Sequence, residues 1–179
     1  MVNVKEMANK SEEISKEFKN LFIQHYANEG VPSTMTGITE FIVSIFQFGI
    51  EADKLEGNSG TPFNDLLSSG INLGINQIGF HISKIDEDEG IPKIPAHTNL
   101  PESEQIQLVK QIDHKFISLF IEAYTNTRPE LAMAGLTTFL SNILTSSHYT
   151  SDEILSSFIK ALNRMINDKG IELIVVTKE

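Results

Sequence analysis

The chain has 179 residues, 40% hydrophobic and 21% charged, which is enough apolar sequence to bury a core in one domain or in two fused halves. It has no cysteine, which excludes disulfides, zinc–thiolate sites and thiol nucleophiles and suits a reducing cytosol. No segment has the pattern of a signal peptide or the length of a membrane span, so we expect a cytoplasmic protein that does not bind membranes.

The charge of the chain restricts its partners. The formal net charge is −10, with 7 basic and 14 acidic residues in residues 1–98 and 7 and 10 in residues 99–179. A basic surface supplies most of the affinity for a phosphate backbone, so nucleic acid is not expected to bind. The acidic first half instead favours a partner with a basic or amphipathic segment.

An internal repeat dominates the sequence. Residues 14–46 align without a gap with residues 112–144, and 12 of the 33 pairs are identical, where unrelated segments would share roughly two. A repeated unit of this size buries its apolar face against its copy, so the duplication predicts the architecture. The identical pairs are Ile14/Ile112, Phe18/Phe116, Leu21/Leu119, Phe22/Phe120, Ile23/Ile121, Tyr26/Tyr124, Asn28/Asn126, Met35/Met133, Gly37/Gly135, Thr39/Thr137, Phe41/Phe139 and Ile45/Ile143.

The first half predicts three helices and a strand. A first helix is expected to start at an N-cap near Asn9 and to end around Gly30 and Pro32. Two more helices are expected at 34–53 and 62–78. A short apolar run follows, which predicts a strand at 80–85.

The second half predicts the same order. The copy of the first helix ends near Thr127, which opens an apparent capping box, and a second helix is expected at 129–147. Another capping box at 150–153 predicts a third helix at 151–168. The run at 171–177 predicts a second strand.

Together these elements predict a mainly α (α+β) fold of two tandem helix-helix-helix-strand repeats related by a pseudo-two-fold axis. A lone strand is unsatisfied, so the two strands are expected to pair, although a local hairpin between 80–85 and 91–94 is the alternative. The expected organisation is one fused domain, with these parts: an N-terminal arm at 1–9, a first repeat at 10–85, an acidic, proline-rich linker at 86–101 and a second repeat at 102–179.

No pattern in the sequence predicts catalysis, a metal or a cofactor. The five histidines lack metal-ligand spacing, and the serines lie outside nucleophile motifs. The acidic run at 86–89 and the glycine-rich stretch at 57–61 are typical of loops. Gly37 and Gly135, present in both copies, are expected to let the two second helices approach each other closely.

A difference between the copies predicts a partner site. At three matched positions the first half is apolar and the second polar: Val43/Ser141, Phe48/Ser146 and Ile50/His148. An exposed apolar patch of this kind usually marks a binding surface, with Val43, Phe46, Phe48 and Ile50 as its anchors. The alternative is that the N-terminal arm or the loop at 54–61 covers these residues.

The sequence therefore favours a non-enzymatic protein-binding module of the adaptor, secretion-chaperone or immunity-protein type, which holds a helix or extended segment in an apolar groove. The rival interpretation is a small-ligand binder or enzyme with a pocket between the repeats. The residues of that pocket would be His25, Tyr26, Glu40 and Tyr124. A homodimer that uses the apolar patch is a third option.

Overall fold

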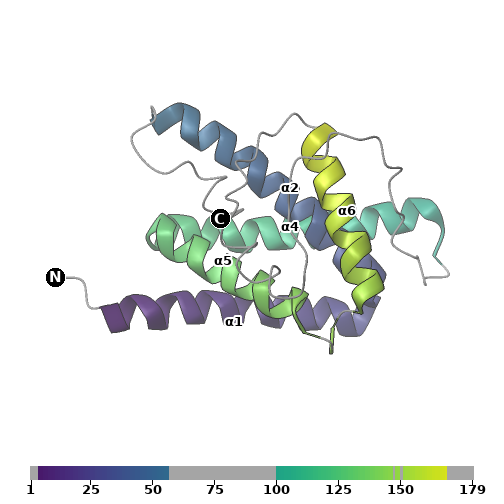
Figure 1. The fold of residues 1–179 in the computed structure, drawn as a ribbon, viewed down its shortest axis with the longest axis horizontal. Coiled ribbons are helices and arrows are strands. Elements are labelled where there is room, and N and C mark those ends of the chain that lie inside the picture. The colour runs from purple at the N-terminus through teal and green to yellow at the C-terminus, as the bar shows by residue number, and fades with distance from the viewer. Residues whose placement is uncertain (1–3, 57–99, 147, 150, 169–179) are drawn as a thin grey trace, which may run out of the picture.

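The computed structural model describes residues 4–56, 100–146, 148–149 and 151–168, and this part of the chain is mainly helical, as expected. It contains five helices, which are α1 Val4–Glu29, α2 Val31–Glu56, α4 Glu102–Asn126, α5 Pro129–Leu144 and α6 Asp152–Asp168 (Figure 1). The expected helix at 62–78, the strands at 80–85 and 171–177, and most of the linker lie outside the described residues. The described part contains no strand.

The first helix starts earlier than the sequence suggested. α1 already begins at Val4, so Asn9 lies inside the helix and residues 4–9 are not a separate arm. The helix ends where expected, because Gly30 has a φ of 81° that other residues rarely adopt, and its amide donates to the carbonyl of Tyr26. Pro32 then falls in the first turn of α2, where its missing N–H costs nothing.

The capping box expected at Thr127 does not form, and the one expected at 150–153 includes residues outside the description. The Thr127 hydroxyl donates to the Ala123 carbonyl at the end of α4, and the N-cap of α5 is Arg128, which makes no capping hydrogen bond with its side chain. At the start of α6 it is Ser151 that caps, since its Oγ accepts the Ile154 amide at 3.3 Å.

The helices form two hairpins, α1–α2 and α4–α5, which pack across each other. α1 lies beside α5 and α2 lies beside α4, and these two contacts are more extensive than those within either hairpin (Figure 1). α6 packs on α2. Each hairpin therefore buries its apolar face mainly against the other hairpin and not against itself.

Two glycines fix how closely these pairs approach. A Cβ atom on Gly37 in α2 would fall within 3.0 Å of the Ile112 side chain in α4, and a Cβ atom on Gly135 in α5 would fall equally close to Ile14 in α1. Both glycines and both isoleucines are matched pairs of the repeat. The glycines do allow a close helix approach, but the expected partner is wrong: each second helix approaches the first helix of the other repeat, and not the other second helix.

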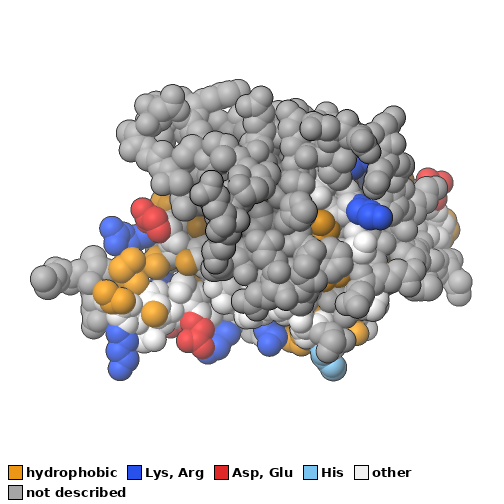
Figure 2. Space-filling view, in the orientation of Figure 1, with side chains coloured by type: hydrophobic (Ala, Val, Ile, Leu, Met, Phe, Trp, Pro, Cys, Tyr) orange, Lys and Arg blue, Asp and Glu red, His pale blue; other side chains and the backbone are white. Residues whose placement is uncertain are grey.

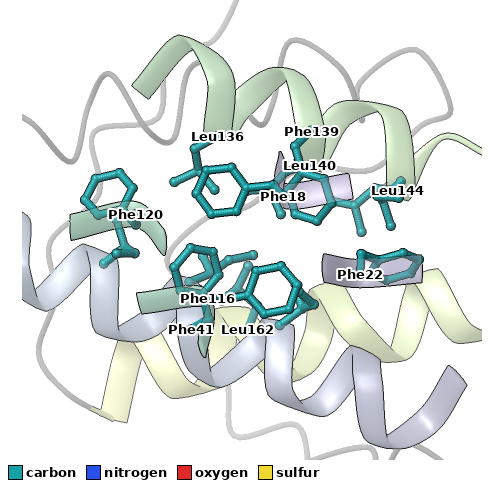
Figure 3. Packing of buried hydrophobic residues seen from close by; sticks show 14 of the residues in the cluster. Phe18, Phe22, Phe41, Phe116, Phe120, Leu136, Phe139, Leu140, Leu144 and Leu162 are labelled. Carbon is teal, nitrogen blue, oxygen red and sulfur yellow. The ribbon is translucent and has the colours of Figure 1, made fainter. Parts of the chain in front are cut away.

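Four phenylalanines form the centre of the core. Phe18 and Phe116 stack at 6.2 Å between ring centroids, with an interplanar angle of 7°. Phe18 lies 5.5 Å from Phe139, and Phe116 lies 5.4 Å from Phe41 (Figure 3). All four are fully buried or nearly so, and each such ring contributes roughly 1.5–3 kcal/mol by leaving water.

Candidate functional site

The residues expected to form an exposed apolar patch are largely inside the protein. Val43 and Phe46 are 1% and 0% exposed and belong to the core cluster. Phe48 is half-buried, with its ring edge-on to Phe120 and Tyr124 at 6.1 and 5.3 Å. The side chain of Ile50 lies outside the description. The expectation of an exposed surface at Val43, Phe46 and Phe48 is therefore corrected, because Val43 and Phe46 belong to the core and Phe48 packs on two aromatic rings of α4.

Ser146 stands at the position of the second half that matches Phe48, but the aromatic rings next to it are still covered. Tyr149, in the connection between α5 and α6, lies edge-on to Phe22 and Tyr26 at 5.4 and 5.6 Å. These two rings match Phe120 and Tyr124 in the repeat. Thus an aromatic side chain covers the same ring pair in both halves, although it comes from a different position in each.

The rival set of polar residues does not converge on one pocket. Tyr26 contacts Phe22 and Tyr149, whereas Tyr124 contacts Phe48 and Phe120, so the two tyrosines belong to separate aromatic groups. Glu40 is half-buried on α2.

His25 is the most buried of this set, at 2% exposure. Its Nδ1 lies 3.0 Å from Oε2 of Glu29, one turn along α1, and its ring lies 6.2 Å from that of Phe116. Its Nε2 is buried and has no hydrogen-bond partner. The matched residue in α4 is Ala123, so the histidine is a feature of one half alone.

A hollow between α1 and α4 was not predicted from the sequence. Its volume is about 490 Å³, and it is open to solvent. None of His25, Tyr26, Glu40 and Tyr124 lines it. It is lined by Glu17, Leu21, His114, Lys115, Ser118, Leu119 and Glu122. Leu21 and Leu119 are identical in the two copies, and that identity was the only sequence signal that pointed to this place.

Two isoleucines are exposed although both copies retain them. Ile23 on α1 and Ile121 on α4 are 39% and 46% exposed, whereas most of the identical apolar pairs are buried. Each follows a leucine of the hollow by two residues, which places it about 200° around its helix from that leucine. A search for apolar residues that are retained outside the core stripe would have found both positions.

Further apolar surface lies where α1 begins. Figure 2 shows hydrophobic side chains gathered over this end of the molecule, and Val4 is 80% exposed. Charged side chains lie nearby, among them Lys10 and Glu13, whose Nζ and Oε2 atoms are 3.0 Å apart. This hydrogen bond and the charge of Glu13 raise the pKa of Lys10.

Within the described ranges, no group of three or more histidine, aspartate and glutamate side chains is placed to hold a metal ion. No helix of the same ranges combines the length and the apolar sequence needed to cross a bilayer. Comparisons with protein-family models, with curated proteins and with solved structures find no match to this chain.

Proposed function

We propose that the chain is a non-enzymatic protein-binding module, of the adaptor, chaperone or immunity-protein type, which acts in the cytoplasm. The observation that carries this proposal is the pair of exposed isoleucines, Ile23 and Ile121, at matched positions of the duplicated helices. Exposed apolar side chains contribute nothing to the core, so their presence in both copies favours contact with another molecule.

The proposed partner is a protein with an amphipathic helix or an extended segment. Its apolar side chains would cover the isoleucines, and basic residues around them would be attracted by the net charge of −10. In this proposal a pseudo-two-fold axis relates the two halves. The reciprocal contacts of Gly37 with Ile112 and of Gly135 with Ile14 support that relation, as does the pairing of α1 with α5 and of α2 with α4.

The test is a pull-down from the native cytosol with the wild type and with Ile23→Ser/Ile121→Ser. We expect a stoichiometric partner that the double variant loses, while circular dichroism shows the same helix content. Ile106→Ser is the matched control, because Ile106 is 49% exposed on α4 but its counterpart in α1 is Ala8. If the double variant retains its partners as well as the control does, the isoleucines are not the binding surface.

A further inference from the structure

The hollow between α1 and α4 is lined by a matched pair of leucines with opposite charges beside them. Its apolar floor is formed by Leu21 and Leu119, both half-buried and at matched positions of the repeat. Glu17 precedes Leu21 by one turn, and Lys115 precedes Leu119 by one turn. Position 17 matches position 115, so the duplication has kept the leucines and inverted the charge beside them.

The direction of the helices separates these charges. α1 and α4 run in opposite directions (Figure 1). A residue one turn before its leucine lies about 6 Å along the axis, toward the start of its own helix. Glu17 and Lys115 therefore lie toward opposite ends of the hollow.

The remaining ionisable residues strengthen this polarity. Glu122 follows Leu119 by three residues, which places it toward the same end as Glu17. His114 is adjacent to Lys115 in the chain and lies at the other end. Within the part of the chain that the structure describes, Glu17, Lys115 and Glu122 form no salt bridge, so these charges are available to a molecule that docks on the hollow.

We propose that the occupant of this hollow is a second copy of the same chain. A two-fold axis that lies in the plane of the face, perpendicular to the line from Glu17 to Lys115, brings each Glu17 against the Lys115 of the other copy. The same rotation lays the apolar floor of one copy, formed by Leu21 and Leu119, over that of the other, which removes the leucines from water. The interface is isologous and self-complementary, as closed homodimers require.

The experiment is sedimentation velocity of the full chain over a wide concentration range. Glu17→Lys sets lysines against each other at both contacts, and Lys115→Glu sets glutamates against each other, so each should raise the dimer dissociation constant at least about tenfold. The double swap, Glu17→Lys with Lys115→Glu, restores opposite charges at both contacts and should return the dissociation constant to near the wild-type value.

Lys19→Glu is the control for Lys115→Glu. It changes the net charge by the same amount, but Lys19 lies on the side of α1 that faces away from the hollow, so the dimer should be unchanged. A wild type that stays monomeric at every concentration would overturn the proposal, as would single swaps without effect or a double swap that does not recover. This inference does not rest on the proposed function, since the purified protein is measured without any partner and Ile23 and Ile121 are not altered.

Discussion

The two halves of the molecule cover the same pair of aromatic rings by different means. In one, Phe22 and Tyr26 of α1 are covered by Tyr149 from the connection between α5 and α6. In the other, Phe120 and Tyr124 of α4 are covered by Phe48 from within α2. The rings that need cover are identical at matched positions of the two segments, while the covering ring comes from a different position in each. A polar residue at a matched position therefore does not imply a polar surface.

The largest effect on stability is expected at the centre of the core, where the equivalence of the two halves can be tested. Phe18→Ala and Phe116→Ala each remove a fully buried ring, and each should lower the free energy of unfolding by about 3–5 kcal/mol. If the halves are equivalent, the two losses should agree within about 1 kcal/mol, which is within the context dependence of such substitutions. Urea denaturation measures both, and a much larger difference would show that one hairpin dominates the core.

Substitutions at the two glycines should have the next largest effect on the free energy of unfolding. Gly37→Ala and Gly135→Ala add a methyl group where Ile112 and Ile14 already lie, and overpacking of this kind costs about 1–3 kcal/mol. Part of this is offset by the better helix propensity of alanine, about 0.5–1 kcal/mol. Gly135→Ala should be the more damaging, because the backbone carbonyl oxygen of Ser11 also lies 3.0 Å from the added atom.

A double-mutant cycle decides whether these losses come from the contact itself. Ile112→Ala removes the nearest atom, so its combination with Gly37→Ala should cost less than the sum of the two single substitutions. Ile14→Ala, combined with the same Gly37→Ala, is the matched control and should be additive. Equal coupling in both pairs would mean that the glycine acts through general strain.

Substitution of the covering rings, Phe48 and Tyr149, should lower the free energy of unfolding less than substitution of the central phenylalanines or the glycines. Phe48→Leu and Tyr149→Leu retain an apolar side chain but remove two edge-on ring contacts each, and each should cost about 0.5–1.5 kcal/mol. Thermal unfolding of both variants compares a ring held by a helix with a ring held by a connection. Unequal losses would show that the two covers differ in strength as well as in origin.

The helices could be predicted from the sequence because their apolar positions recur with helical spacing in both copies. Ile14, Phe18 and Phe22 in α1 have identical counterparts in α4, and all six side chains are buried. The glycines were also predictable, since Gly37 and Gly135 lie in helices where their low propensity needs a compensating contact. What could not be predicted is that each contact joins one hairpin to the other, because local periodicity does not specify a partner.

The exposure expected of the apolar patch is not found, and the same comparison shows a physical reason. The contrast between Phe48 and Ser146 was interpreted as extra apolar surface on the first half. In the structure Phe48 faces the aromatic rings of α4, and Tyr149 takes the corresponding place over α1 although its matched residue is Glu51. Compensation between unmatched positions cannot be seen in an alignment of the two copies. The hollow also could not be predicted, since it depends on how α1 crosses α4.

The crossed packing of the hairpins has a consequence for what happens when the chain is cut. α1 completes its burial on α5, and α2 completes its burial on α4, so a hairpin alone would expose most of its phenylalanines to water. The central row of rings comes from α1, α2, α4 and α5, and the chain passes from one hairpin to the other between α2 and α4. Two fragments separated between these helices should therefore each be incompetent to fold alone and should recover the native core when mixed, as two complementary parts of one molecule.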